Sequence, residues 1–357
     1  MIAESIVPLL SAAVAARADV FDARHEAAFR LFNGFTEGCP DLVVDLYART
    51  IVLHNYADPP PRAGPLLPAV QAYLRSELPW LRAIVLKTRH AARLADRHGV
   101  LLWGDRPDRR VRDPQGSVWY AIDLLMQRDA GFYLDTRNVR RWAQEHLAGK
   151  TVLNAFAYTG SLGVAAKAGG ARRVVHLDRN RAFLNVAKTS YTLNGFLIDK
   201  ADFQAGDFFT LASRLRRTGE RFDCVLVDPP FFAETSKGRI DMIHQSERIL
   251  NKVRPLVEDG GYLVAINNAL FASGADYLRT LDALCADGYL SIDELIPVPP
   301  DFTGAPHTRV GSPPVDPAPF NHSTKIAVLR VRRKDSQSGL ADDSPSITRA
   351  PAAMNSG

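Results

Sequence analysis

The sequence contains only three cysteines in 357 residues, and no two of them form a CxxC pair. Neither a cysteine-based zinc site nor a disulfide framework is therefore expected. No run of 18 or more apolar residues occurs, which excludes a membrane-spanning helix. Glu4 stands ahead of the first apolar stretch where a signal peptide would have a basic region, so we expect no export signal. These absences predict a cytoplasmic protein that needs neither a membrane nor a metal.

A strong charge of either sign is also missing. The chain has 44 Lys and Arg residues against 39 Asp and Glu, which gives a net charge of +5. This mild excess permits a polyanionic partner but does not require one. Hydrophobic residues make up 46% and charged residues 23%, as in ordinary globular proteins. The chain can therefore bury a sizeable core, and its length predicts two or three domains.

Changes in pattern along the chain predict four parts. Residues 1–20 form an N-terminal helix, and residues 21–125 form a small α+β domain with short strands separated by Gly and Pro. A larger domain follows at 126–333. Small and polar residues dominate 334–357, for which we expect a disordered tail. The oligomeric state is not predictable from these patterns.

In the larger domain, apolar strand runs alternate with helices. Asp135 or Thr136 is positioned to cap a helix over 137–147, and a second helix is expected over 240–260. Such alternation predicts an α/β fold with a mostly parallel sheet and helices on both faces. The last two strands have no helix between them, so we expect them to pair antiparallel at one edge.

A parallel α/β sheet binds ligands beyond the carboxyl ends of its strands. After the first strand, Gly160 permits a tight turn and the next helix offers free N–H groups. Asp178 ends the second strand, where it suits ribose hydroxyls, and Asp207 ends the third, where it suits an adenine amine. This order indicates a class I S-adenosyl-L-methionine site. The alternative is a nicotinamide dehydrogenase, but the GxGxxG fingerprint is missing.

Four segments resemble those of bacterial class I methyltransferases of large-subunit rRNA. They are GFYLDTRNVRRW (131–142), VLNAFAYTGSLGVAAKAGGARRVVHLDRN (152–180), DPPFF (228–232) and INNALF (266–271). The set is most similar to the guanine-N7 methyltransferase half of a bifunctional 23S rRNA enzyme. Residues 25–47 look like the small domain of 23S rRNA cytosine-C5 methyltransferases. The resemblance covers residues 21–333, and it implies a Rossmann-like fold with a seven-stranded sheet and S-adenosyl-L-methionine as cofactor.

Carried over residue by residue, the resemblance implies a complete cofactor site. Asp178 would hold the ribose, while Asp207 and Phe208 would hold the adenine. The other expected cofactor-binding residues lie before, within and after the loop that follows the first strand. They are Tyr133, Asp135, Arg137, Asn154, Phe156, Tyr158, Thr159, Gly160, Arg179 and Asp228.

The sequence departs from the cytosine-C5 family in two respects. We expect no counterpart of its amino-terminal RNA-binding module. The nucleophilic cysteine that cytosine-C5 chemistry needs is also missing. Phe231 and Phe232 follow the DPP strand, and Asn267 and Asn268 follow the next strand. The sequence therefore favours methylation of a base nitrogen, either guanine N7 or an exocyclic amine.

The expected catalytic residues surround the DPPF turn. Its rigid Pro-Pro unit would fix hydrogen-bond acceptors, and its aromatic ring would stack on a base that has left its helix. The paired amides after the next strand match an Asn-Asn pair in the guanine-N7 enzyme and would read a base edge. The catalytic set is Asp228, Pro229, Pro230, Phe231 and Asn267.

RNA, expected to be rRNA, is the predicted substrate. Phosphate contacts are expected from the basic stretch 106–112 and from the TSKGR segment after DPPFF. The substrate-binding set is Phe231, Phe232, Lys237, Arg239, Asn268, Arg109 and Arg110. Alternatives left open are a small-molecule or protein methyltransferase, an rRNA cytosine-C5 methyltransferase, and a binding module without catalytic activity.

Overall fold

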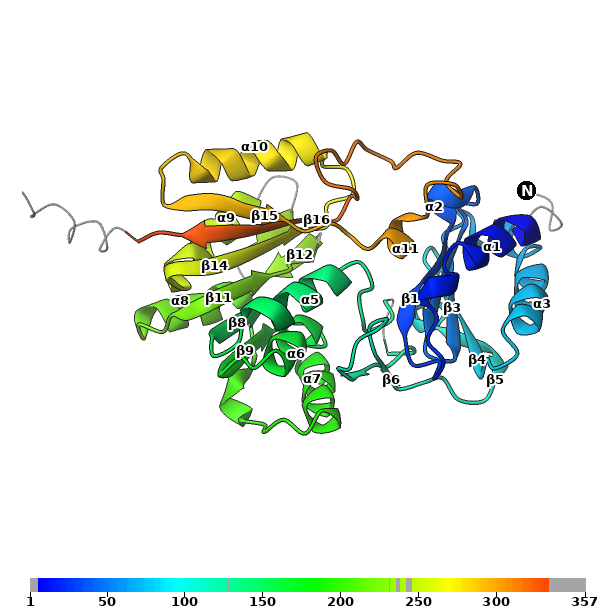
Figure 1. Cartoon of the computed structure of the whole chain (residues 1–357), viewed down its shortest axis with the longest axis horizontal. Helices are drawn as coiled ribbons and strands as arrows, with labels where there is room; N and C mark the ends of the chain where they lie inside the picture. The colour runs from blue at the N-terminus through cyan, green and yellow to red at the C-terminus, as the bar shows by residue number, and fades with distance from the viewer. Residues whose placement is uncertain (1–5, 127–128, 231, 236–237, 242–245, 334–357) are drawn as a thin grey trace, which may run out of the picture.

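The computed structural model describes residues 6–126, 129–230, 232–235, 238–241 and 246–333. Two sheets lie side by side along the long axis of the molecule (Figure 1). We call β1–β5 the small sheet and the seven-stranded sheet the large sheet. Among the described residues, no helix is both long and apolar enough to span a lipid bilayer.

The small sheet has the strand order β1-β2-β3-β4-β5. Its pairs are antiparallel except for β3 and β4, which are parallel because α3 connects them. Helices α1 and α3 bury their apolar residues against one face. The elements of this part are α1 (Ile6–Ala15), β1 (Ala28–Asn33), α2 (Gly34–Glu37), β2 (Leu42–Tyr47), β3 (Thr50–Asn55), α3 (Leu67–Glu77), β4 (Ala83–Thr88), α4 (Leu94–His98) and β5 (Val100–Gly104). A two-stranded ribbon of β6 (Arg110–Val111) and β7 (Tyr120–Ala121) follows.

The large sheet has the order β10-β9-β8-β11-β14-β16-β15. Helices α5, α6 and α7 pack on one face, and α8, α9 and α10 pack on the other. Strand β16 is antiparallel to both neighbours, as expected for the last two strands. The helices are α5 (Arg137–His146), α6 (Ser161–Ala168), α7 (Arg181–Leu193), α8 (Phe208–Arg217), α9 (Ser246–Val253), α10 (Gly274–Cys285) and α11 (Pro300–Thr303). The strands are β8 (Thr151–Ala155), β9 (Arg173–Asp178), β10 (Phe203–Ala205), β11 (Phe222–Val227), β14 (Val257–Asn267), β15 (Leu290–Leu295) and β16 (Lys325–Val331). The predicted α/β class with a seven-stranded, mostly parallel sheet is confirmed.

Two local predictions are wrong. The helix expected over 240–260 is only α9, because β13 (Gly238–Asp241) pairs with β12 (Phe232–Thr235) before it and β14 already begins at Val257. The side chains of Asp135 and Thr136 do not cap α5. Instead, Thr136 donates to the carbonyl of Tyr133, and the Asp135 carboxylate accepts from Thr324 on the far side of the chain.

The two sheets share buried contacts. Tyr47 and Val52 of the small sheet belong to the same apolar cluster as residues of α5 and β8. Arg17 is almost fully buried, binds both carboxylate oxygens of Glu37, and donates to the backbone carbonyl of Asp301 in α11. The chain after β15 thus crosses over to the small sheet, as Figure 1 shows for α11. The domain boundary near residue 125 stays a prediction, because the apolar cluster extends across it.

Candidate active site

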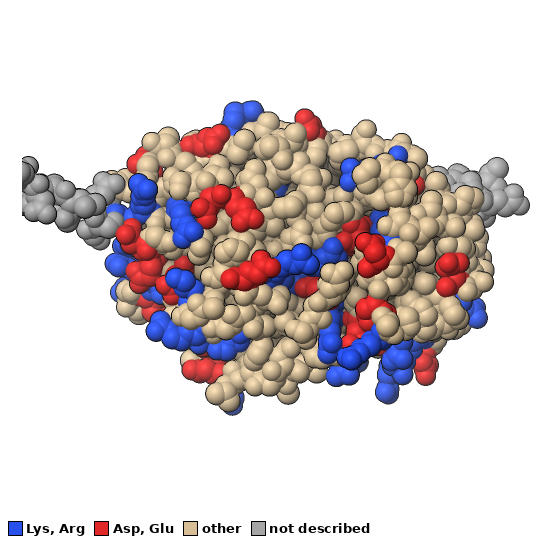
Figure 2. Space-filling view, viewed as in Figure 1, with Lys and Arg blue, Asp and Glu red and all other residues tan. Residues whose placement is uncertain are grey.

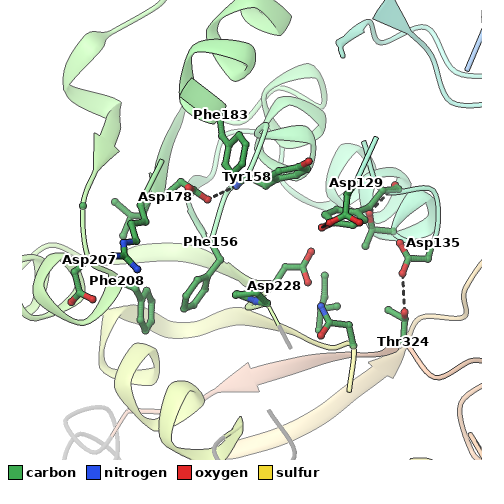
Figure 3. A pocket seen from close by; sticks show the side chains of 18 residues that line it. Asp129, Asp135, Phe156, Tyr158, Asp178, Phe183, Asp207, Phe208, Asp228 and Thr324 are labelled. Atoms are coloured by element: carbon green, nitrogen blue, oxygen red, sulfur yellow. Dashed lines mark hydrogen bonds between the residues drawn. The ribbon is translucent and has the colours of Figure 1, made fainter. Parts of the chain in front are cut away.

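A cavity of about 430 Å³ opens beyond the carboxyl ends of β8, β9, β10, β11 and β14. This volume lies in the range of small-molecule ligand sites. Figure 3 shows its side chains converging from these strand ends, with Asp207 and Phe208 at one end and Asp135 and Thr324 at the other. The sheet therefore places its ligand site where parallel α/β folds usually carry one.

The loop after β8 has an unusual backbone. Phe156 and Tyr158 adopt φ angles of 57° and 50°, the left-handed region that residues with a Cβ rarely occupy. Gly160 follows at φ 81°, and a Cβ there would lie 2.5 Å from Cβ of Ala187. Strain of this kind persists when the surroundings enforce it, and it is frequent at ligand sites. The loop turns the Phe156 and Tyr158 side chains into the cavity wall.

Asp178 connects this loop to the end of β9. Its Oδ2 accepts from the N–H of Tyr158 at 2.8 Å, and its Oδ1 accepts from the N–H of Asn180 at 2.7 Å. Burial raises the pKa of this carboxyl. Each oxygen can accept a further hydrogen bond, so the carboxylate can bind two neighbouring hydroxyls from within the cavity.

Aromatic rings line the same end of the cavity. The rings of Phe156 and Phe208 lie 4.3 Å apart, and Phe183 meets Tyr158 edge-on at 4.5 Å. Asp207 caps α8, because its Oδ1 accepts from both the N–H and the hydroxyl of Thr210. Flat apolar walls beside these carboxylates suit a nucleoside.

Near the centre of the cavity lies the carboxyl of Asp228 (Figure 3). Burial, together with the charge of Asp135, raises its pKa to about 8. Asn268 donates from Nδ2 to the carbonyl of Pro229 at 3.2 Å, which joins the turn after β11 to the turn after β14. Three buried atoms of the cavity-lining residues make no hydrogen bond in the structure: Asp135 Oδ1, Tyr158 OH and Asn268 Oδ1. Unsatisfied polar groups in a cavity indicate ligand partners.

The structure brings together many of the predicted site residues. Those that line the cavity are Tyr133, Asp135, Phe156, Tyr158, Asp178, Arg179, Asp207, Phe208, Asp228, Pro230 and Asn268. Pro229 and Gly160 flank it in the chain without lining it.

Four predicted residues lie elsewhere for physical reasons. Arg137 binds the carboxylate of Asp301 in α11, so its guanidinium connects two parts of the chain and does not close the cavity. Asn154 is buried beside the ring of His176, with 3.3 Å between their side-chain nitrogens. Thr159 is buried as well and donates to the carbonyl of Gly131. Asn267 accepts from the N–H of Ala269 and faces a second cavity between α9 and α10.

Several lining residues were not predicted. Asp129 accepts from Arg89 at 2.8 Å and from the hydroxyl of Tyr133 at 3.2 Å. Asp129 and Tyr133 lie outside helices and strands, so their spacing gave no signal of this pair. Thr324 and Phe183 reach the cavity through the fold, and no local pattern identifies them. The remaining unpredicted lining residues are Thr136, Leu177, Gly206 and Ile266.

The expected RNA-facing residues are only partly covered. Phe231 and Lys237 lie outside the described residues, as do the side chains of Phe232 and Arg239. Arg109 is 78% exposed and lies 3.8 Å from Asp123. Arg110 is exposed at the start of β6 and stacks over Trp119 at 4.4 Å.

All three cysteines belong to the described part of the chain, and none lines the cavity. Cys224 is fully buried inside β11, where burial strongly raises the pKa of its thiol. Cys39 is buried under the small sheet, and Cys285 ends α10. A thiolate nucleophile is therefore not available at this site.

Comparisons with known proteins agree with this geometry. A family model described as S-adenosylmethionine-dependent methyltransferase matches residues 93–310. The ribosomal RNA large subunit methyltransferase I of Erwinia tasmaniensis is 30% identical over 241 residues, which cover 67% of this chain and 60% of that protein. The enzyme of that name from Photobacterium profundum is 30% identical over 280 residues, covering 74% of this chain and 68% of its own length. The chain thus spans about 60% of the Erwinia relative.

Solved structures support the same fold. A methyltransferase candidate crystallised with S-adenosylhomocysteine superimposes with a TM-score of 0.78 at 20% identity, over 93% of this chain and 82% of that one. A SAM-dependent methyltransferase from Agrobacterium tumefaciens gives a TM-score of 0.55 at 18% identity, over 82% of this chain and 87% of that one. The family match covers more than half of this chain. The chain therefore belongs to the S-adenosylmethionine-dependent methyltransferases, and S-adenosylmethionine is its cofactor.

Proposed function

We propose that this methyltransferase modifies large-subunit rRNA and transfers the methyl group to a base nitrogen, either guanine N7 or an exocyclic amine. The choice of RNA is supported by the relatives, whose names describe large-subunit rRNA methyltransferases. The choice of nitrogen rests on one observation. The cavity wall includes polar and rigid groups, namely Asp228, Pro230 and Asn268, and the three thiols lie elsewhere.

The cofactor fits the carboxylates and rings of the cavity. Asp178 would hold the ribose hydroxyls, while Phe156, Phe208 and Asp207 would enclose the adenine. Tyr158 would hold the methionine part through its unpartnered hydroxyl. When bound, the cofactor supplies an activated methyl group on a positively charged sulfur.

The residues that would align the base lie beside the centre of the cavity. Asn268 and the carbonyls of the DPP turn would hold the base edge, and Phe231 would stack on its face. Guanine N7 already carries a free lone pair, so no general base is needed. Alignment alone can lower a barrier by roughly 7–11 kcal/mol. For an exocyclic amine, Asp228 would accept the proton that the nitrogen releases.

RNA contact would involve Arg109 and Arg110, which extend from the β6 ribbon. Arg110 and Arg112 both stack on Trp119, at 4.4 Å and 3.9 Å. Figure 2 shows basic and acidic side chains interleaved over the visible face. Binding through a few phosphate contacts should therefore weaken with salt, although less steeply than for a strongly basic protein.

A labelling experiment tests this proposal. The purified chain is incubated with tritiated S-adenosylmethionine and rRNA from cells in which its coding sequence is deleted. Nucleoside mass spectrometry then identifies the product, and borohydride reduction followed by aniline cleavage maps any 7-methylguanosine. A methylated guanine or amine supports the proposal. Methylation at C5 of cytosine would overturn the choice of nitrogen, and no labelled rRNA would overturn the substrate.

A further inference from the structure

Lys325 occupies an unusual position at the start of β16. Its side chain is fully buried, and none of the ion pairs found among the described residues includes it. Its Nζ donates to three backbone carbonyls: Ala269 at 2.9 Å, Ala272 at 3.1 Å and Ser323 at 2.6 Å. An ammonium has three donors, so all of them are used. Burial of a charge without a counterion is costly, and the three carbonyls offset part of that cost.

The three carbonyls belong to two separate segments. Ala269 and Ala272 lie in the turn after β14, and Ser323 lies in the segment that enters β16. Phe271, at the tip of the turn, is 67% exposed, while Ala269 and Ala272 are buried in the apolar core. The ammonium therefore joins two segments that are distant in sequence.

In each segment, a residue that lines the cavity is the direct neighbour of a residue whose carbonyl accepts from Lys325 Nζ. Asn268 precedes Ala269 and lines the cavity with its unpartnered Oδ1. Thr324 lies between Ser323 and Lys325, and its hydroxyl donates to Asp135 at 2.8 Å. Thr324 lies beside Asp135 at the end of the cavity away from Asp207 and Phe208, as Figure 3 shows, and Asn268 lines the same cavity.

We propose that Lys325 is a positioning residue that fixes Asn268 and the Thr324–Asp135 pair as one rigid wall for the target base. This inference rests on the proposed function, because it assigns this end of the cavity to the base. The adenosine end is built from β9, β10 and the loop after β8, none of which contacts the ammonium. Loss of Lys325 should therefore misplace the base and leave the grip on the adenosine unchanged.

The test is Lys325→Met, which keeps an unbranched side chain one atom shorter than that of lysine and removes its donors. We expect kcat for rRNA methylation to fall on the order of 100-fold, as for a displacement of about 1 Å at a reacting group. Calorimetric affinity for S-adenosylhomocysteine should stay within about twofold. Lys200→Met, at an exposed lysine of the large-sheet region, is the matched control. Leu74→Ala, in the buried core of α3, controls for lost stability.

A second variant and a second measurement keep the inference testable. Lys325→Gln keeps two donors, so its kcat should lie between those of Lys325→Met and the parent. It replaces Lys325→Met in the test if that variant does not fold. Hydrogen exchange should accelerate in 268–272 and 322–324 and stay unchanged in 156–160. The inference would be overturned if both variants had the same kcat and the same hydrogen-exchange rates as the parent. If the parent methylates no RNA, the proposed function fails, and exchange alone decides whether Lys325 holds the two segments.

Discussion

Replacing Asp228 by Asn is expected to abolish a pH dependence of cofactor binding. Burial and the charge of Asp135 raise the pKa of Asp228 to about 8. At pH 7 this carboxyl is therefore protonated in roughly nine molecules of ten. A cationic sulfonium bound at the same wall favours the ionised form. Binding of S-adenosylmethionine should then release a proton and tighten as the pH rises.

The magnitude follows from linkage. If only the ionised form binds the cofactor, the dissociation constant falls about ninefold from pH 6 to pH 7 and about fivefold more by pH 8, and then levels off. S-adenosylhomocysteine carries a neutral sulfur, so its affinity should change much less. Asp228→Asn should remove the slope for both ligands.

Stability provides a second readout of the same substitution. The pKa of Asp228 lies about four pH units above its usual value of 3.8. By pH 8 this difference lowers the free energy of unfolding by at most about 6 kcal/mol. Contact with cavity water should reduce this value. Because the unfolded carboxyl ionises near pH 4 and the folded one near pH 8, this stability is lost progressively between pH 4 and pH 8 and levels off above pH 8. Asp228→Asn should therefore match the parent near pH 4 and become more stable than the parent toward pH 8.

Calorimetry in two buffers of different ionisation enthalpy counts the released protons. At pH 7 the parent should release about 0.9 proton with S-adenosylmethionine, and Asp228→Asn should release none. An equal slope for the two ligands, or a slope retained in Asp228→Asn, would refute the assignment of the charge to this carboxyl.

Three further results are expected. Asp178→Ala should abolish cofactor binding, because it removes the acceptor of the Tyr158 N–H as well as the ribose ligand; unchanged calorimetric affinity would contradict this. Replacing all three cysteines by Ala should leave turnover intact at temperatures where the variant is folded, and a folded but inactive variant would restore the covalent route. Arg17→Met should cost about 3–5 kcal/mol in chemical denaturation, because it leaves Glu37 buried without its partner; a loss below 1 kcal/mol would show that the pair is not needed.

The predicted residues that line the cavity are mostly those that directly follow a strand of the parallel sheet. Periodicity locates the ends of β9 and β10, and a parallel sheet brings those ends to one edge. Asp178 and Asp207 were therefore recognisable as neighbours although they lie far apart in the chain. The tight turn after β8 was recognisable through Gly160, but the left-handed backbone at Phe156 and Tyr158 was not.

The unpredicted part depends on pairs of distant segments. Arg137 was assigned to the cofactor through the family resemblance of the FYLDTR segment, but its partner Asp301 comes from α11. Thr324 reaches the cavity because β16 inserts next to β14, which no local pattern reveals. The prediction of a long helix over 240–260 was wrong for a similar reason. Strand β13 pairs with β12, and a local pattern does not show this pairing.

The apolar cluster that Tyr47 and Val52 share with α5 and β8 limits how this enzyme can be re-engineered. A chimera that takes its first 125 residues from a relative would need to match the whole surface that packs against the remaining chain. This includes single hydrogen bonds, such as the one that the Tyr47 hydroxyl donates to the carbonyl of Phe132. A change in substrate specificity should therefore be easier to obtain by altering surface loops than by replacing the whole amino-terminal part.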